Sequence, residues 1–555
     1  MTNLLHHALR RCEIISELNE IKSMRKGSLN SKHQNVKHKN GEVCVKGPYY
    51  ELTKMGTGGK TVSQSVPANE VNHMQKEVDN YKRFRQLTDE YVEVCEKISI
   101  LIGSDEKKKL NLAGEFELEI YKFATKVAEM KESGEAMPFE EIEKGFRFAA
   151  LRGGNLIFDK FLSNMEDPAP MCQKCGSKMN NRGKRDKRVV SLLGEGTVSR
   201  HYYECMECGH HYIPKDALLD IENTSFTPGV RRVVSKLAAC DSFEDCSAAM
   251  IELCGIHVPV KDIERIAEMA GAAIEAEKQK EIEKVFSLKE ASRTTESVPI
   301  MYIEYDGTGV PVRKRETDGR KGKQADGTAK TREVKLGCIF TQTGLDEKGK
   351  PVRDENSTTY FGAIETSNEF SKRLYMEAVN RGVDFALKVV VLGDGAKWIW
   401  TLAAENFPSA VEIIDLYHAR ERLWEFIKKF IINADAQNHL KDDWYKLLDK
   451  GHIKKLTSEM KQSVINNEGS LEDADSEINY FTENTARMQY ANFKKQGLFV
   501  GSGVIEAGCK NVIGKRLKQS GMHWSVDGAN AVIALRCAIL SGQFDEFETK
   551  MARNL

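Results

Sequence analysis

The sequence predicts a multidomain α/β protein, and three features of the 555-residue chain support this prediction. The chain is longer than one ordinary domain and can bury more than one core. Two Cys-x-x-Cys pairs in its first half flank a segment that alternates like β-strands. In its second half, strand-like and helix-like segments alternate, which is typical of a sheet packed between helices.

Changes in sequence texture divide the chain into five predicted regions. The first two are a basic N-terminal module with a short β-hairpin (1–67) and a helical region (68–165). A cysteine-bearing ribbon (166–222) and a helix-turn-helix-like helical region (223–295) follow. The last region, 296–550, is predicted to be a catalytic α/β domain.

Composition restricts the possible partners and the compartment. Lysine and arginine total 82, as do aspartate and glutamate, so a polyanionic partner must be argued from local patches. The sequence contains no apolar run long enough to span a bilayer, and its first residues do not resemble a signal peptide. Most of the 13 cysteines are scattered singly, which favours a reducing compartment. We therefore expect a cytoplasmic protein.

The two cysteine pairs predict a zinc ribbon. Cys172 with Cys175, and Cys205 with Cys208, form two knuckles, and a hairpin that turns at 194–196 lies between them. Four thiolates arranged in this way suit one tetrahedral, structural Zn²⁺.

Basic side chains accompany this ribbon around a lone acid, Asp186. Their density favours contact with DNA phosphates, although a merely solvated face is the alternative. The residues that we assign to DNA here are Lys184, Arg185, Lys187 and Arg188.

The helical region that follows contains a predicted helix (242–254), a turn with Gly255, and a second helix (259–267). This order is that of a helix-turn-helix, whose second helix can enter the major groove of DNA. Many two-helix corners never touch DNA, and the second helix here carries acids. Its position beside a basic ribbon favours the DNA-binding interpretation.

The second half of the chain predicts a ribonuclease-H-like domain. The predicted strands span 298–306, 332–342, 358–364, 387–393 and 410–415, and the predicted helices span 367–382 and 396–406. Three strands, a helix, a strand and a helix in this order are typical of that fold. A strongly helical segment, about 419–496, is predicted to be an insertion within the domain.

Three acids are the candidate metal ligands of this domain. Asp306 is predicted to end the first strand, Asp394 ends the fourth strand, and Glu506 lies at the start of a late helix. Carboxylates suit a pair of hard divalent cations, and such a pair stabilises the attacking and leaving oxygens of a phosphoryl displacement. The alternative for each acid alone is an ordinary strand-end or helix-capping residue.

Long motifs around these acids resemble the DDE transposases of the Kra-type bacterial insertion sequences, which in turn resemble the Mutator-like transposases. The segments that carry the resemblance are 306–311, 331–338, 392–400, 415–419 and 501–510, and the likeness spans roughly residues 165–550. It implies a catalytic triad of Asp306, Asp394 and Glu506 that holds two Mg²⁺ per site, for which Mn²⁺ can substitute. It also implies that the protein associates with the bacterial nucleoid.

The same resemblance places Asp415 and His418 near the active site, because they match a D/CxxH motif that follows the second aspartate. His418 is expected to contact a scissile phosphate or a flanking strand. The alternative is a strand-end histidine that is hydrogen-bonded to Asp415.

Several cations near the acids are candidate contacts for the DNA backbone. Lys397 follows Asp394, and an acid-free stretch after Glu506 predicts a cationic helix face. The cations of that stretch are Lys510, Lys515, Arg516 and Lys518.

Together these features predict a transposase that binds the inverted repeats at the ends of its element as a homodimer or higher oligomer. It would cleave double-stranded DNA and join the released end to target DNA by two-metal phosphoryl transfer. One alternative is a structure-specific nuclease of the same fold. Another is a zinc-ribbon DNA-binding regulator without catalytic activity, which three intact acids argue against.

Overall fold

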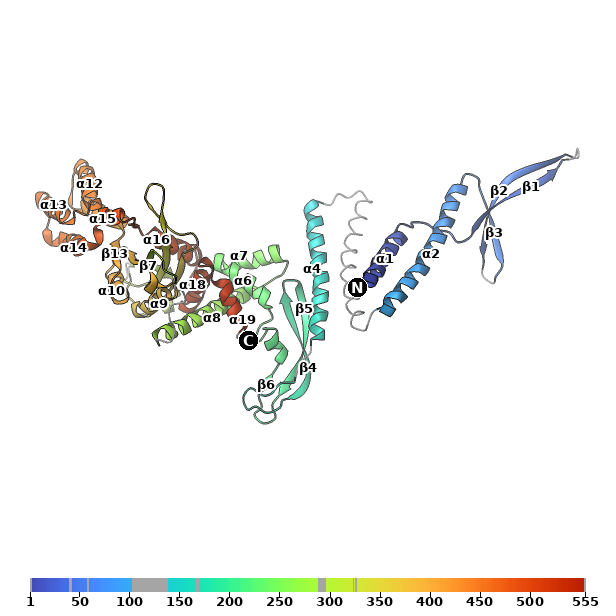
Figure 1. Cartoon of the computed structure of the whole chain (residues 1–555), viewed down its shortest axis with the longest axis horizontal. Coiled ribbons are helices and arrows are strands. Elements are labelled where there is room, and N and C mark those ends of the chain that lie inside the picture. The colour runs from blue at the N-terminus through green and yellow to red at the C-terminus, as the bar shows by residue number, and fades with distance from the viewer. Residues whose placement is uncertain are drawn as a thin grey trace. The chain divides into compact units, whose positions relative to one another are not determined.

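The protein consists of two compact units, Met1–Lys160 and Phe161–Leu555, in a computed structural model (Figure 1). The structure describes residues 2–38, 42–56, 59–101, 138–165, 169–287, 296–322, 324 and 327–553. Residues 102–137 of the predicted helical region, and the junctions 166–168 and 288–295, lie outside the described residues. No described helix is long and apolar enough to cross a membrane.

The described part of the first unit combines helices with a small sheet. Helix α1 (Thr2–Asn19) packs on α2 (Val71–Leu101) through a small apolar cluster that includes Ile14 and Leu87. The sheet is antiparallel, in the order β1-β2-β3, and its strands are β1 (Ser28–Lys37), β2 (Val43–Met55) and β3 (Thr61–Val66). The sequence predicted only a hairpin here, and β3 adds a third strand to it. Helix α4 (Phe139–Asn164) leads into the second unit.

The cysteine-bearing region begins the second unit. Its strands are β4 (Asn180–Ser191), β5 (Gly194–Glu204) and β6 (His211–Tyr212), and the short helix α5 (Pro214–Leu218) follows them. The strands pair antiparallel in the order β4-β5-β6, so the predicted hairpin between the two cysteine pairs is confirmed. It turns at residues 192–193, and not at 194–196 as predicted, because Gly194 already pairs with Ser191.

Next come α6 (Pro228–Cys240), α7 (Phe243–Ala249), a π-helical turn (Met250–Cys254) and α8 (Val260–Phe286). Gly255 joins the last two in a left-handed conformation, with φ of 70°, that glycine adopts without strain. The predicted order of helix, glycine turn and helix is confirmed, but α8 is much longer than predicted.

The helical region is not separate from the end of the chain. Residues of α6 and α8, such as Val234 and Ile263, share one apolar core with Leu535 of α18 (Val526–Leu540) and Phe547 of α19 (Phe544–Arg553). The boundary predicted at 295/296 therefore divides segments that pack together. At the closest approach of α8 and α18, a Cβ on Gly271 would lie 2.1 Å from the carbonyl oxygen of Ala531.

A five-stranded mixed sheet forms the centre of the second unit, in the order β11-β8-β7-β12-β13. Its strands are β7 (Ile300–Pro311), β8 (Thr331–Gln342), β11 (Thr359–Ala363), β12 (Lys388–Gly393) and β13 (Val411–Ile414). Strands β7, β8 and β11 pair antiparallel, whereas β12 is parallel to both β7 and β13. A small hairpin, β9 (Gly344–Leu345) and β10 (Pro351–Val352), follows β8.

Helices cover both faces of this sheet. On one face, the ring of Tyr305 packs against Phe370 of α9 (Ser367–Asn380) and Trp398 of α10 (Lys397–Asn406). On the other face, α16 (Gly503–Gly508) and a π-helical turn (Cys509–Gly514) lie beside β7, and α18 contacts β11. The short helix α17 (Lys515–Leu517) follows the π-helical turn. Because side chains alternate along a strand, Glu304 and Asp306 point toward this second face.

The sequence predicted that strand β7 ends at Asp306, but the strand continues beyond this residue. It continues to Pro311 because its antiparallel partner β8 extends as far as Thr331, well beyond the last residue paired with β12. Asp306 therefore lies within a strand, at the point where the parallel partner ends.

The segment predicted as a helical insertion is helical, and its helices form one cluster next to strand β13 (Figure 1). Its helices are α11 (Leu416–Phe430), α12 (Ala434–Asp449), α13 (Ile453–Asn466), α14 (Leu471–Glu483) and α15 (Tyr490–Lys495). Buried side chains that include Trp444 and Phe481 join these helices to the core of the central sheet.

The contact between α8 and α18 is expected to be sensitive to a single methyl group. Replacing Gly271 by Ala forces two helix backbones apart, so we expect the free energy of unfolding to fall by about 1–3 kcal/mol or more. Gly344→Ala is the matched control, because a Cβ at Gly344 meets no atom within 4 Å. Thermal unfolding of the two variants provides the measurement, and equal midpoints would contradict the close approach.

Candidate metal and phosphate site

Parallel pairing brings three acids into one row at the end of the sheet where strands β12 and β13 finish. Strand β12 pairs with β7 up to Leu392 opposite Glu304, and continuing this register by two residues brings Asp394 beside Asp306. The register between β12 and β13 likewise brings Asp415 beside Asp394, and the Asp415 N–H donates to the carbonyl of Gly393 at 2.8 Å. Neighbouring strands lie about 4.8 Å apart, so carboxylates in such a row are close neighbours.

Asp306 is a largely buried carboxylate with few hydrogen bonds. Its Oδ1 accepts the N–H of Gly307 at 2.7 Å, and its Oδ2 lies 3.7 Å from the Cys509 thiol. Burial raises the pKa of Asp306 above its ordinary value, and the charge of Asp394 acts in the same direction. A cation between the two carboxylates would relieve both effects.

Asp394 is held by a turn and by the helical segment. Its Oδ1 accepts the N–H of Ala396 at 2.9 Å, and its carbonyl accepts the Tyr480 hydroxyl of α14 at 3.2 Å. Gly395 has φ of 98°, and a Cβ there would fall 2.7 Å from the Tyr480 ring. Glycine is therefore needed directly after Asp394, and the helical segment fixes this carboxylate in place.

Glu506 lies on α16, whose first turn is held by two buried carboxylates. Oδ2 of Asp415 accepts the N–H of Ser502, and Oε2 of Glu304 accepts the N–H of Ile505 at 2.9 Å. Acceptors at a helix N-terminus satisfy N–H groups that lack partners within the helix, and a negative charge there is stabilised by the positive end of the helix dipole. These two contacts tie the helix turn of Glu506 to β7 and to the end of β13.

Glu304 is fully buried, and its Oε1 has no hydrogen-bond partner. Burial raises the pKa of Glu304 to about 8, so this side chain is mostly protonated at neutral pH. Sequence reasoning missed Glu304, and its signal would have been an acid inside an otherwise apolar strand, two residues before Asp306.

His418 lies in the first turn of α11, between two carboxylates. Its Nδ1 is 3.5 Å from Asp415 Oδ1 and 3.7 Å from Glu506 Oε1. The Asp415 carboxylate raises the pKa of His418 to about 9, so the ring is a cation at neutral pH in the absence of other ligands. The sequence left two roles open for His418, contact with DNA or pairing with Asp415. In the structure the ring lies beside Asp415 and also beside Glu506.

Asp415 is a structural acid. It is fully buried, its Oδ1 accepts the N–H of His418 at 2.8 Å as the N-cap of α11, and its Oδ2 accepts from Ser502. Burial acts to raise the pKa of Asp415, but the His418 side chain and these backbone donors outweigh burial and lower it. Both oxygens are engaged, so Asp415 positions His418 and Glu506 instead of facing an open ligand position.

The acids surround two adjoining pockets. Asp306 and Glu506 line an open pocket of about 590 Å³. Asp394 lines a neighbouring pocket of about 510 Å³, and the side chains of His418 and Glu421 line both.

The described residues in this area form one tight group of three potential metal ligands, Asp415, His418 and Glu506, whose donor atoms lie within 4.8 Å of one another. Asp306 and Asp394 are not part of such a group of three among the described residues. Asp306 and Asp394 lie side by side in the continued register of β7 and β12, and carboxylates are the ligands that a hard cation prefers. Glu506 faces the same open pocket as Asp306.

The predicted cations divide into three groups. Lys510 and Lys518 are exposed in the pocket with Asp306 and Glu506, and Lys518 Nζ donates to Thr308 Oγ1 at 2.6 Å. Lys515 and Lys397 are exposed as well, but they do not line this pocket. The prediction for Arg516 is wrong.

Arg516 is fully buried, and its Nε donates to the carbonyl of Ala238 near the end of α6 at 2.8 Å. Desolvation lowers the pKa of Arg516 to about 10. Arg516 therefore caps the C-terminus of α6, where carbonyls lack helical partners and favour a cation, and it cannot reach DNA.

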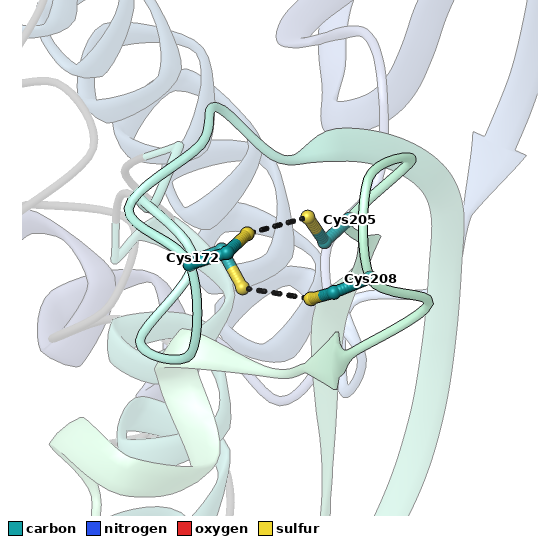
Figure 2. Close-up of side chains that lie close together, drawn as sticks. Cys172, Cys205 and Cys208 are labelled. Atoms are coloured by element: carbon teal, nitrogen blue, oxygen red, sulfur yellow. Dashed lines mark hydrogen bonds between the residues drawn. The ribbon is translucent and has the colours of Figure 1, made fainter.

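The four ribbon cysteines form a second cluster (Figure 2). Their sulfurs lie within 4.8 Å of one another, at 3.6 Å between Cys172 and Cys208 and 3.4 Å between Cys175 and Cys205. Four sulfurs around a Zn²⁺ at Zn–S distances of about 2.3 Å would be roughly 3.8 Å apart. The cluster thus has nearly the size that zinc requires.

The two knuckles have the same backbone form. The Cys172 N–H donates to the carbonyl of Ser177 at 2.7 Å, and the Cys205 N–H donates to that of His210 at 2.8 Å. A glycine in the left-handed conformation follows the second cysteine of each pair. Hydrogen bonds from Ser177 lower the pKa of Cys175 to about 6, whereas burial and the neighbouring cysteines raise the pKa of Cys208 to about 12, so without a metal the four thiols do not all ionise together.

The ribbon's predicted DNA contacts are only partly available. Lys184, Arg185 and Arg188 are exposed, although Arg188 pairs with Glu195 and the Arg185 guanidinium lies 3.8 Å above the ring of Tyr202. The prediction for Lys187 is wrong. Its Nζ donates to the carbonyl of Ile221 at 2.5 Å, next to buried Asp216, so it holds the fold together.

The chain belongs to a family described as "Uncharacterised protein family (UPF0236)", which matches residues 135–553. A relative from Streptococcus gallolyticus, named "UPF0236 protein in vanSb 3'region", is 23% identical over 373 residues. That alignment covers 65% of this chain and 74% of the relative. The family match includes the cysteine cluster and the acidic site and leaves out most of the first unit.

The buried contacts of Asp415 are expected to stabilise the protein more than an ordinary cap does. In Asp415→Ala the Ser502 N–H loses its partner inside the protein, so we expect the free energy of unfolding to fall by about 2–4 kcal/mol. Ser525→Ala, at the N-cap of α18, is the control and is expected to lower it by about 1 kcal/mol. Denaturant unfolding compares the two, and an equal loss would mean that Asp415 is only a helix cap.

Proposed function

We propose that this protein is a DDE transposase with a ribonuclease-H-like catalytic domain. The sheet order β11-β8-β7-β12-β13, with three antiparallel strands continued by parallel ones and helices on both faces, supports this fold. The observation that carries the proposal is the row of Asp306 and Asp394 on adjacent parallel strands, with Glu506 facing the same pocket as Asp306. The sequence resemblance to Kra-type transposases points to the same three acids.

The site suits phosphoryl transfer at DNA. Bound Mg²⁺, held by Asp306, Asp394 and Glu506, would stabilise the attacking and leaving oxygens of an in-line displacement, and Mn²⁺ can substitute for it. Lys510 and Lys518 bring positive charge to the same pocket and can hold the scissile strand by its phosphates. Asp415 fixes His418 and the helix turn of Glu506, so the carboxylate and the imidazole stay in place while DNA enters.

The ribbon and the helical region are proposed to bind the inverted repeats at the element ends. The sulfur spacing supports one structural Zn²⁺ at Cys172, Cys175, Cys205 and Cys208. The exposed cations Lys184, Arg185 and Arg188 support phosphate contact by the ribbon. Cleavage of two ends requires two active sites, so the protein is proposed to act as a homodimer or higher oligomer on DNA.

A nuclease of the same fold would share this site, and the assay must separate the two functions. A transposase joins the 3′-hydroxyl of a cleaved end to a second duplex, whereas a nuclease releases products only. Incubating pre-cleaved element ends with plasmid DNA and Mg²⁺ should give joined products. Cleavage without any joined product would favour the nuclease, and the absence of both reactions would contradict the proposal.

The three acids are expected to be individually essential for cleavage. In Asp306→Asn, Asp394→Asn and Glu506→Gln, loss of one ligand charge should lower cleavage by more than about 100-fold, since even outer-shell residues contribute 10–100-fold. DNA affinity, measured in Ca²⁺, should remain nearly unchanged. Glu405→Gln, an exposed glutamate on α10, is the control and should keep full activity. Full activity in any of the three variants would contradict the assignment.

The cysteine cluster is expected to hold one zinc per chain. In Cys172→Ser, loss of one thiolate should remove most of the zinc and loosen the ribbon, because metal binding contributes directly to the folding of such sites. Cys44→Ser, an exposed cysteine of the first unit, is the control and should keep its zinc. Elemental analysis together with limited proteolysis of the ribbon provides the measurement. Wild-type protein without stoichiometric zinc would overturn this assignment.

A further inference from the structure

A second polar pocket of about 810 Å³ is lined by the segment that directly follows the helix of Glu506. Its walls come from the loop before β11, the end of α18 and residues of the 509–517 segment. The polar side chains that define it are Arg353, Asn511, Lys515, Arg536 and Ser541.

The pocket has three cations and no carboxylate among its lining residues. Arg353 and Lys515 are exposed, and neither makes an ion pair within the described parts of the chain. Arg536 is buried, and its guanidinium donates to the carbonyls of Val512, at 2.6 Å, Ala239 and Asn511.

These carbonyls accept from the guanidinium of Arg536, and no carboxylate among the described residues forms an ion pair with it. Desolvation accordingly lowers the pKa of Arg536, although the charge of Asp241 acts to raise it. An anion in the pocket would compensate the charge of all three cations, and the open, polar shape suits a strand of phosphates better than an apolar ligand.

The segment 509–517 separates this pocket from the catalytic one. Lys510 and Gly514 line the pocket with Asp306 and Glu506, whereas their neighbours Asn511 and Lys515 line the second pocket. Residues four apart lie on one face of a helical segment, so one face serves the acids and the adjacent face serves the cations.

We propose that Arg353, Lys515 and Arg536 form a binding site for backbone phosphates of DNA outside the catalytic pocket. The inference rests on the proposed function and extends it. DNA held at Lys510 and Lys518 continues past the 509–517 segment, and its next phosphates bind in the second pocket. This arrangement uses two faces of the segment to hold DNA, while Glu506, on the helix before the segment, faces the catalytic pocket.

The test is the salt dependence of DNA binding by the full-length protein. A fluorescein-labelled 30-base-pair duplex of arbitrary sequence is titrated by anisotropy in Ca²⁺ at 50–200 mM KCl. Each lost phosphate contact lowers the slope of log K against log[salt] by about 0.9. In the double variant Arg353→Ala/Lys515→Ala, the slope should therefore fall by about 1.8. Affinity should then change about tenfold less over this salt range than in the wild type.

A matched double variant removes the same charge elsewhere. Lys454 and Lys461 are exposed on α13, and Lys454→Ala/Lys461→Ala should keep the wild-type slope. Equal slopes in the two double variants would overturn the second site while leaving DNA binding intact. No DNA binding by the wild type would instead overturn the proposed function, and the second site with it. Equal thermal midpoints of both double variants exclude misfolding as a cause.

Discussion

The parallel pairing of β12 with β7 and β13 is the constraint on which the rest of the site depends. Because the pairing fixes register, Asp306 within β7 and the residues directly after β12 and β13, Asp394 and Asp415, fall into a single row. A slip of one residue would turn each strand's side chains to the other face and separate the acids. The buried apolar residues around them, among them Ile303 and Leu392, hold that register.

Two buried carboxylates extend the constraint to a segment far away in sequence. Asp415 and Glu304 accept the N–H groups of Ser502 and Ile505, so the helix turn that carries Glu506 is fastened directly to the sheet. The charged Asp415 carboxylate makes a charge-assisted hydrogen bond, which is stronger than a neutral one, and loss of either acceptor would leave a buried N–H without a partner. The helical segment adds a third fixation, because Tyr480 holds the backbone of Asp394. Three separate parts of the chain thus position one acidic site.

Sequence patterns predicted the elements of the catalytic half closely, because its strands are continuous apolar runs bounded by glycine and its helices have regular apolar faces. The cysteine cluster was also predictable, since the spacing of two knuckles permits few other structures. The tertiary roles of individual charges were not. Arg516 and Lys187 lie in basic stretches of the sequence that predict exposed side chains, yet each donates a hydrogen bond to a backbone carbonyl inside the fold. Local sequence does not show that a helix end such as that of α6 needs a cation from a distant segment. The shared core of α8 and α18 was missed for the same reason.

The central claim is that Asp306, Asp394 and Glu506 hold divalent cations at one site. Crystals of the protein soaked in Mn²⁺ test it most directly, because anomalous scattering locates Mn²⁺ without any assay of activity. We expect Mn²⁺ between the carboxylates of Asp306 and Asp394, and a second ion about 3.5–4 Å away that contacts Glu506. Mn²⁺ bound only by Asp415, His418 and Glu506, or no Mn²⁺ at these residues, would contradict the account.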